Sequence, residues 1–438
     1  MTSMMTRRKF AELGATVGAA TVVRWQAAQA SAVTGANDRI RVAMIGVGNR
    51  GGQLLDGFRQ QSDVQIVALC DIFAPHLRKT ASRLEHRADQ YHDFRELLDR
   101  QDLDAVVIAT PDHWHAIQTI AACQAGKDVY VEKPLSMTIH EGQRMVEAAR
   151  RTGRVVQVGT QRRSASLWQK AAAMVQANQL GKVTVSRAFR LSNMYPNGIG
   201  KMPPTDPPND LDWDRWLGPR PQQPYQANVA PYKFRWWQLY SSQLANWGVH
   251  YLDAIRWFLG EQEPSSVCAL GGRFAVDDDR TIPDTAEAIF EFSCGHLALF
   301  ATFEASGNPA LREGELELRG TQGTLYLGGT TLHVVPEEGG QFQDPTPRMQ
   351  PVQLRVDQSA QDPTAQHIRN FLDCMRSRQR PNADVAIGHR STTMSLLANI
   401  SLATRSRLEW DAQQERIISP SEANDLLHYE YRSPWRLD

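Results

Sequence analysis

The sequence is 438 residues long, more than one domain usually holds, so it predicts two domains. Hydrophobic residues make up 42% and charged residues 22%, ordinary globular values that argue against a disordered chain or a membrane bundle. Lys plus Arg and Asp plus Glu both number 48, so no net charge points to nucleic acid or an anionic membrane as partner. Five cysteines without CxxC spacing indicate neither a zinc site nor a disulfide framework, and no metal is expected. The expected partner is a small molecule.

Residues 1–30 have the pattern of an export signal. The sequence RRKF at 7–10 is followed by a weakly apolar run at 11–23 and by AQA at 28–30, a small-x-small cleavage site. This order is typical of a twin-arginine signal, although an amphipathic N-terminal helix is the alternative. The apolar run is shorter than the roughly 20 residues that span a bilayer. We expect a mature protein that begins near Ser31, has no membrane span, and is exported folded to the periplasm or beyond.

From residue 38 onward, short apolar segments alternate with amphipathic ones, which is typical of βαβ units and a parallel sheet. The expected strands are Ile40–Ile45, Val64–Leu69, Ala105–Ala109, Val129–Val131 and Val155–Val158. The expected helices lie near 53–60, 75–86, 114–125 and 139–152. We therefore predict a doubly wound α/β domain over residues 31–160.

A glycine-rich loop follows the first of these strands directly. Its residues are Gly46, Gly48, Asn49, Arg50 and Gly51. A GxGxxG pattern is weak evidence alone, but here a strand precedes it, a helix follows, and Asp71 ends the next strand, which completes the dinucleotide fingerprint. The pyrophosphate would lie at the helix N-terminus, and Asp71 would bind the adenosine ribose hydroxyls and repel a 2′-phosphate. The pattern favours NAD over NADP; the alternative is a loop that holds nothing.

Two further clusters stand at the carboxyl ends of later strands, where ligands bind in open α/β sheets. The additional residues predicted to contact the cofactor are Thr110, Pro111, His115, Glu132 and Lys133. Pro134 disfavours helix at Lys133 and keeps it extended at the strand tip. A lysine held away from bulk water has a lowered pKa and can exchange a proton with a substrate hydroxyl, although a lysine taken alone is more often a solvated surface charge.

The glycine loop, Thr110-Pro111, Glu132-Lys133-Pro134 and a downstream histidine together resemble the Gfo/Idh/MocA oxidoreductases over nearly the whole mature chain. The resemblance implies that an N-terminal Rossmann domain is followed, over residues 161–438, by an α+β domain. Its open, mainly antiparallel sheet would face the nicotinamide and mediate oligomerisation. The matching strand patterns are 183–189, 266–271, 285–292, 297–304, 315–319 and 323–327, and late helices at 367–376 and 388–402 would pack back on the first domain.

The family's acid/base motif is Asp-x-x-x-His on a helix of the second domain. His250 occupies the histidine position here, and its ordinary pKa suits it to move a hydroxyl proton. Asn246 stands where the family has Asp, so it can form hydrogen bonds but cannot accept a proton. The resemblance implies that Lys133 and His250 share the proton role and that Asn246 orients the substrate. His250 would otherwise be a satisfied histidine in a packed helix, and Asp253 a structural partner.

Three more residues are predicted at the substrate. Arg162 and Arg163 lie where the family often places an arginine in the cleft, although a charged interdomain hinge is the alternative. Trp236 belongs to a long segment rich in Pro and aromatic residues, whose rings suit stacking on sugars. The same rings could instead pack the segment onto the sheet or a neighbouring subunit.

Export and a nicotinamide cofactor must be reconciled, because the periplasm has no evident pool of soluble NAD. Export in the folded state permits loading NAD beforehand, and a trapped NAD requires a redox-neutral cycle on a sugar, sugar derivative or cyclitol. An exported family member that this chain resembles in domain order works in that way. An alternative is an NAD-dependent glycosidase that acts by transient C3 oxidation and elimination. A third hypothesis is a non-catalytic carbohydrate-binding protein with a vestigial Rossmann domain.

Overall fold

The computed structural model describes residues 39–357 and 363–437. The predicted export signal at residues 1–30, with its cleavage site, lies outside these residues. Export and localisation therefore stay predictions.

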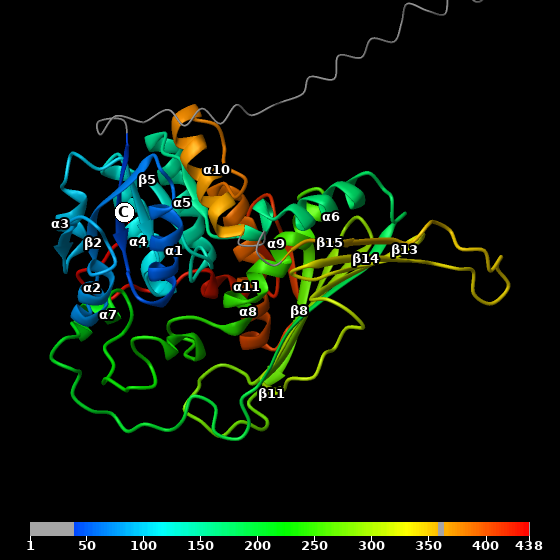
Figure 1. Ribbon diagram of the computed structural model, residues 1–438. Helices are drawn as coiled ribbons and strands as arrows, with labels where there is room; N and C mark the ends of the chain where they lie inside the picture. Colours follow the sequence, from blue (N-terminus) through cyan, green and yellow to red (C-terminus); the bar gives the residue numbers. More distant parts are fainter. Residues whose placement is uncertain (1–38, 358–362, 438) are drawn as a thin grey trace, which may run out of the picture. The chain divides into compact units, whose positions relative to one another are not determined.

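The first sheet is entirely parallel and has six strands (Figure 1). In spatial order they are β3 (Asp89–Tyr91), β2 (Val64–Cys70), β1 (Ile40–Ile45), β4 (Ala105–Ile108), β5 (Asp128–Val131) and β6 (Val156–Val158). Because β1 pairs with β2 on one side and with β4 on the other, the strand order reverses there and opens a crevice at the carboxyl ends. The predicted Rossmann fold is confirmed. Strand β3 was not predicted, since its three residues are largely exposed and carry no apolar run.

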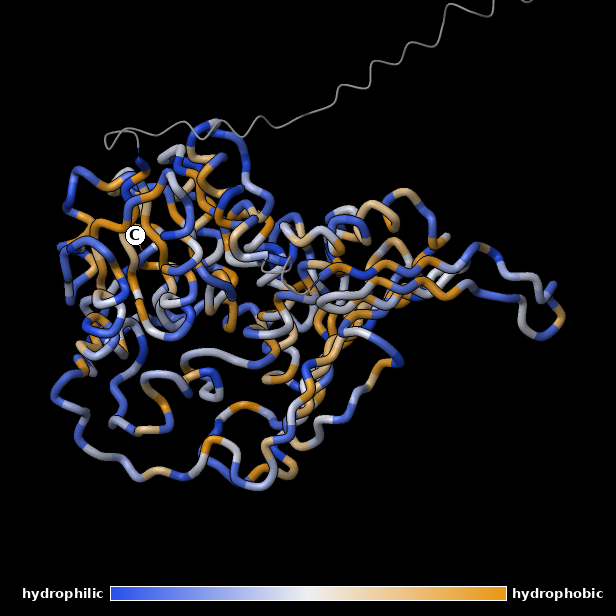
Figure 2. The backbone as a smooth tube through the Cα atoms, viewed as in Figure 1, coloured by the Kyte–Doolittle hydropathy of each residue, from blue (hydrophilic) through white to orange (hydrophobic). Residues whose placement is uncertain are grey.

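Helices cover both faces of this sheet. One face packs against α1 (Asn49–Arg59), α2 (Ala74–Ala81) and α10 (Pro363–Ser377), and the other against α3 (Phe94–Leu98), α4 (His115–Gln124) and α5 (Ile139–Thr152). Late in the chain, α10 returns to this early domain: the rings of Phe371 in α10 and Phe58 in α1 lie 6.4 Å apart. Hydrophobic colour runs along the strands of this domain in Figure 2, as expected for strands buried on both faces.

The second sheet has eleven strands and is mainly antiparallel, as predicted. Along its path lie β15 (Val352–Arg355), β14 (Thr331–Pro336), β13 (Gly323–Leu327), β12 (Leu316–Gly320), β7 (Val183–Asn193), β10 (His296–Phe303), β9 (Thr285–Phe292), β8 (Pro264–Gly272), β16 (Leu408–Asp411) and β17 (Arg416–Ser419), while β11 (Ala305–Ser306) pairs with β7. Only β7 and β10 run parallel to each other. Five strands of this sheet were not predicted from the sequence. Strand β11 has two residues and β15, β16 and β17 have four each, too few for a clear alternation. Strand β14 has six residues and was also missed.

Helices cover one face of the second sheet, and the other face is open. The covering helices are α6 (Ser166–Gln176), α8 (Gln243–Asn246), α9 (Gly248–Phe258) and α11 (Val385–Thr404), while the short α7 (Trp213–Leu217) lies in the segment between β7 and α8. Helix α11 contacts α5 and β6 as well as α9 and β8, so it joins the two sheets. On the open face, Leu270, Ile289 and Leu297 are exposed. Among the helices of the described ranges, none combines the length and apolar character needed to cross a bilayer.

Candidate functional site

The glycine loop joins β1 to α1 at the sheet's carboxyl edge. Gly46 has φ +81°, which favours glycine, and a Cβ there would lie 2.7 Å from the Thr110 nitrogen. A Cβ on Gly51 would lie 1.9 Å from the Gly46 oxygen, so only glycine lets helix and loop pack this closely. A Cβ on Gly48 would lie 2.8 Å from the ring of His76. Close backbone approaches therefore require glycine at 46 and 51, whereas at 48 an added Cβ would meet only the side chain of His76.

The amino terminus of α1 is open to an anion. No side chain caps it at Gly48, and its first turn holds no acidic residue. The first N–H groups of a helix lack intrahelical partners, and the helix dipole favours negative charge beside them. Gly48, Asn49 and Arg50 line a cavity of about 490 Å³, a volume within the usual range for ligand sites. The loop therefore fits the pyrophosphate of a dinucleotide.

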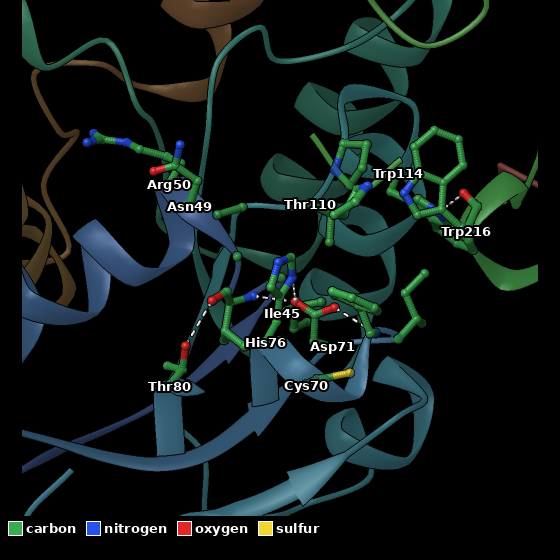
Figure 3. A pocket seen from close by; sticks show the side chains of 18 of the residues that line it. Ile45, Asn49, Arg50, Cys70, Asp71, His76, Thr80, Thr110, Trp114 and Trp216 are labelled. Carbon is green, nitrogen blue, oxygen red and sulfur yellow. Dashed lines mark hydrogen bonds and ion pairs between the residues drawn. The ribbon is translucent and has the colours of Figure 1, made fainter. Parts of the chain in front are cut away.

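Asp71, at the start of the loop after β2, faces the same cavity (Figure 3). Its Oδ2 accepts the Val47 N–H at 2.9 Å and its Oδ1 accepts the Phe73 N–H at 2.9 Å. His76 Nδ1 lies 3.3 Å from Oδ2. A carboxylate offers about four acceptor sites, so capacity remains for a ribose hydroxyl. The negative charge is fixed in place beside the glycine loop, as selection for NAD requires.

Two segments that are distant in sequence cover the cavity. Residues 210–216 pair with the loop after β2, since Ala74 N–H donates to Asp210 O at 3.0 Å. Trp114 Nε1 donates to Trp216 O at 3.2 Å. From the C-terminal segment, Trp435 lines the cavity and lies 4.7 Å from the Trp114 ring, centroid to centroid. Its buried indole Nε1 has no hydrogen-bond partner within the described ranges. A dinucleotide in this cavity would therefore contact both segments.

The predicted cofactor residues after β4 divide into two groups. Thr110 and Pro111 line the cavity. His115 does not appear in its lining: the buried ring lies between two carbonyl groups, with Nδ1 2.8 Å from Pro134 O and Nε2 3.0 Å from Thr110 O. His115 ties the two loops together rather than facing the cofactor site.

Glu132 is buried at the end of β5 and pairs with the glycine loop. Its Oε1 accepts from Arg50 Nε at 2.7 Å, and its Oε2 accepts the Lys133 N–H at 3.2 Å. Burial alone would raise the pKa of Glu132, but Arg50 and Lys133 hold it below its ordinary value. Glu132 thus fixes Arg50 at the cavity and orients the strand tip that carries Lys133.

Lys133 reaches across to the second domain. Its Nζ donates to both the backbone oxygen and Oδ1 of Asn246, each at 2.8 Å. Burial lowers the pKa of Lys133 to about 8. Nearby charges act in both directions, with Arg235 and Arg50 lowering the pKa and Glu132 and Asp112 raising it. The structure therefore brings the predicted Lys133 and Asn246 together and gives the lysine a pKa near neutrality.

His250 lies in the first turn of α9, four residues after Asn246. Burial lowers its pKa well below the ordinary 6.5, and the charges of Lys133 and Arg162 add to this. Its buried Nδ1 has no hydrogen-bond partner in residues 39–357 and 363–437. Neither Lys133 nor His250 lines the main cavity. The charges of the lining residues Arg50 and Arg235 act on Lys133, and that of Arg50 acts on His250. His250 is thus a neutral ring with an unused polar atom.

Two predicted substrate residues form side-chain contacts with distant segments. Arg163 is buried and forms a bidentate pair with Asp253, with Nε–Oδ2 and NH2–Oδ1 distances of 2.8 and 2.9 Å, so it does not face the cleft where it was expected. Asp253 thus has a structural role. Trp236 donates its indole N–H to Glu304 at 2.9 Å. Like Lys133 and His250, Trp236 does not line the main cavity, and its role at the substrate stays a prediction.

Arg162 forms structural contacts but keeps part of its guanidinium without a hydrogen-bond partner in the part of the chain that the structure describes. Its guanidinium lies between the rings of Trp168 and Tyr251, 4.4 and 4.2 Å from their centroids, and NH2 donates to Glu315 at 2.7 Å. Its buried NH1 has no hydrogen-bond partner among the described residues. The sandwich holds a positive charge near His250 without committing all of its donors.

Sequence reasoning missed Gln243, Glu304, His76 and Trp435 as residues of this region. These four carry no local signal, since each reaches its place through the fold. Arg235 belongs to the aromatic segment that the sequence had already singled out. No group of three or more His, Cys, Asp or Glu side chains in the described part of the chain is placed to hold a metal.

Family comparison agrees with this geometry. Residues 40–160 match the model of an oxidoreductase family with an NAD-binding Rossmann fold, and residues 169–288 and 330–437 match that family's C-terminal alpha/beta domain. This chain belongs to the Gfo/Idh/MocA oxidoreductase family. Its Rossmann domain is an NAD-binding one.

Individual Gfo/Idh/MocA relatives match over shorter stretches. A glycosyl hydrolase family 109 protein of Solibacter usitatus is 36% identical over 128 residues, 27% of this chain and 29% of the relative. An inositol 2-dehydrogenase of Salmonella paratyphi B is 30% identical over 145 residues, 33% of this chain and 43% of the relative. Both matches thus span less than half of the relative. The structure of levoglucosan dehydrogenase with NADH and levoglucosan aligns with TM-score 0.65 and 17% identity over 85% of this chain and 99% of that chain, a similarity of fold.

Proposed function

We propose that this protein is an NAD-dependent oxidoreductase that acts on a hydroxyl or carbonyl group of a sugar, sugar derivative or cyclitol. The observation that carries the proposal is the amine of Lys133, which is held on Asn246 beside His250 and has a pKa near neutrality. Bound NAD supplies the hydride acceptor and donor. The names of an inositol dehydrogenase and a levoglucosan dehydrogenase among the similar proteins support the substrate class.

Lys133 and His250 have different roles in the proposed reaction. Lys133 Nζ accepts the hydroxyl proton when the substrate is oxidised and returns it when a carbonyl is reduced. His250 is neutral at physiological pH, so we assign it the orientation of the substrate hydroxyl through its free ring nitrogen. The proton role that the family motif implies for both residues thus falls mainly to Lys133. The reaction needs exclusion of water, which burial of Lys133 and Asn246 favours.

We further propose that NAD stays bound through a redox-neutral cycle. The cover formed by residues 210–216 and Trp435 supports retention, because a ligand beneath it leaves only when packed segments move. To test retention, protein purified without added cofactor is denatured, and the supernatant is analysed for NAD by mass spectrometry. About one NAD per chain is expected. Trp435→Ala should release NAD faster than the wild type. Trp257→Ala, a substitution in helix α9, serves as the control. Equal release rates from the two variants would show that Trp435 does not retain NAD.

The activity test uses the same protein without added cofactor. It is incubated with a panel of sugars and cyclitols, and oxidised and reduced products are counted by mass spectrometry. Equal amounts of the two products are expected, with Lys133→Ala and His250→Ala abolishing turnover but leaving NAD bound. Full activity in either variant would show that its assigned role is wrong.

A second candidate is an NAD-dependent glycosidase that oxidises C3 transiently, eliminates the aglycone, adds water and reduces C3 again. It is favoured by the glycosyl hydrolase name of the Solibacter usitatus relative. Release of free sugar from aryl glycosides, with exchange of the C2 hydrogen for solvent deuterium, would establish this activity instead.

If no NAD is released on denaturation and added NAD gives no thermal shift, the non-catalytic carbohydrate-binding hypothesis replaces both enzyme hypotheses.

Export and self-association complete the proposal. The RRKF sequence and the cleavage pattern at 28–30 support export by the twin-arginine route to the periplasm or beyond. Changing Arg7 and Arg8 to Lys should retain the protein in the cytoplasm.

The exposed Leu270 and Ile289 on the uncovered sheet support a homo-oligomer. Light scattering during size-exclusion chromatography measures the assembly, and a monomer at all concentrations would contradict it.

A further inference from the structure

A continuous chain of side-chain hydrogen bonds leads away from Lys133. Lys133 Nζ donates to Asn246 Oδ1 at 2.8 Å, and Asn246 Nδ2 donates to Gln243 Oε1 at 3.2 Å. Gln243 Nε2 then donates to Glu304 Oε1 at 3.1 Å. Gln243, Asn246 and Glu304 are all buried. The four residues come from the tip of β5, from α8 and from the end of β10, so the chain crosses between the two domains.

The far end of this chain is held by a buried cationic group. Glu304 Oε2 accepts from Arg280 NH1 at 2.6 Å and from Trp236 Nε1 at 2.9 Å. Arg280 is fully buried and also pairs with Asp278, with an Nε–Oδ1 distance of 2.8 Å. Burial raises the pKa of Glu304, and Arg280 and Trp236 oppose the rise. With three N–H groups directed at it, Glu304 is best satisfied as a carboxylate.

A carboxylate at this end determines the direction of every bond in the chain. It can only accept, so Gln243 must present its NH2 group to Glu304 and its carbonyl to Asn246. Asn246 must then present its NH2 group to Gln243 and its carbonyl to Lys133. With either amide reversed, a donor would face a donor, and a buried polar group would lose its partner.

We propose that Glu304 is a positioning residue for Lys133, which acts through Gln243 to orient the carbonyl of Asn246 toward the lysine amine. In the family motif an Asp at position 246 would accept from Lys133 in either orientation. Asn246 has one accepting end only, so this chain needs a remote acid to decide which end faces the lysine. The role of Lys133 in proton transfer rests on the proposed function; the orientation itself does not.

The proposal predicts the result of exchanging the acid and the amide. In Glu304→Gln, the new amide must keep its carbonyl toward Arg280 and Trp236, so it presents its NH2 group to Gln243. Gln243 must then accept at that end, which reverses the direction of every hydrogen bond in the chain. Asn246 then turns its NH2 group toward Lys133. In Asn246→Asp, the acid suits Lys133 but faces the Gln243 carbonyl. The double variant has no mismatch, because the Asp accepts from both Lys133 and a reversed Gln243.

The first readout needs no substrate. Competitive acetylation of the NAD-loaded protein across a pH series, quantified by mass spectrometry of the Lys133 peptide, gives the pKa of the amine. Glu304→Gln should lower this pKa because an acceptor is replaced by a donor, and the double variant should restore it to the wild-type value or above. Turnover should fall about tenfold in each single variant and recover in the double variant.

Two further variants separate orientation from loss of stability. Glu263→Gln is the matched control, because Glu263 accepts from buried Arg256 at 2.6 Å but is not joined to Lys133 in the hydrogen bonds described above. It should lower the melting temperature and leave the pKa of Lys133 unchanged. Gln243→Met interrupts the chain without changing charge and lets Asn246 turn either end to the lysine, so it should lower the pKa in the same direction as Glu304→Gln but by less, even where Glu304→Gln fails to fold.

The outcomes distinguish the two proposals. A pKa of Lys133 that is unchanged in Gln243→Met, or a double variant no better than the worse single variant, would overturn the positioning role. If the pKa values follow the expected pattern but no sugar is converted, the proposed function fails and the positioning role stands.

Discussion

The lowered pKa of Lys133 predicts a specific pH dependence for each half of the proposed redox cycle. With a pKa of about 8, the neutral amine makes up about 10% of the population at about pH 7 and about 90% at about pH 9. Oxidation of a hydroxyl needs the neutral amine as base, so its rate should rise about tenfold over this interval. Reduction of a carbonyl needs the ammonium as acid, so its rate should fall over the same interval.

The two halves can be measured separately on protein that already holds its cofactor. Mixing the NAD form with excess sugar gives the oxidation rate from the appearance of NADH absorbance, and mixing the NADH form with a keto sugar gives the reduction rate. Lys133→Arg keeps a positive charge that does not titrate in this range, so its oxidation rate should be low and flat. Because the pKa of His250 lies well below 6.5, no inflection is expected near that value.

Arg235 and Asp112 shift the pKa of Lys133 in opposite directions, so substitutions of the two residues provide matched controls. Arg235 lowers the pKa of Lys133, so Arg235→Gln should move the inflection to higher pH. Asp112 raises it, so Asp112→Asn should move the inflection to lower pH. An inflection that persists in Lys133→Arg, or that moves in the same direction in both neighbour variants, would refute the assignment of the titration to Lys133.

Three further predictions concern the cofactor and stability. Asp71→Ala should weaken NAD binding and relax selection against NADP in calorimetric titrations; an unchanged preference would remove Asp71 from cofactor selection. Asp253→Asn leaves the buried guanidinium of Arg163 with Glu261 as its remaining ion-pair partner and should lower the free energy of unfolding by about 3 kcal/mol in urea titrations, whereas a loss below about 1 kcal/mol would contradict tight coupling between Arg163 and Asp253. Burial lowers the pKa of His367 to about 4 in the folded state, so stability should be lost as pH falls from 6.5 toward that value, by about 2 kcal/mol at about pH 5, and His367→Gln should flatten this slope.

Much of the fold could be predicted where the signal is local. Helix α5 has the predicted bounds, because Thr138 and Glu141 form a capping box at its start and Gly153 adopts a left-handed conformation at its end. Strands β9 and β13 also match, since β9 alternates between buried and more exposed residues and β13 is buried throughout. Strands of four residues on the rim of the second sheet could not be predicted, because their pairing depends on partners elsewhere in the chain.

In the candidate site too, residues with a local sequence signal could be predicted and residues that depend on distant partners could not. The glycine loop, Asp71 and Lys133 were recognisable because a strand followed by a turn brings its end to one edge of a parallel sheet, whatever the rest of the chain does. Arg163 was misplaced because its partner Asp253 lies 90 residues away, and a charge that appears free in sequence became a buried pair.

By itself, the sequence determined the cofactor class and predicted the edge of the sheet where the cofactor would bind and the lysine proposed to act beside it, because these depend on contacts within one βαβ unit. Only the tertiary structure decided how the lysine is held. Lys133 meets Asn246 across 113 residues and Gln243 meets Glu304 across 61. The direction of a buried amide depends on which donors and acceptors surround it, and those neighbours exist only once both domains have packed together.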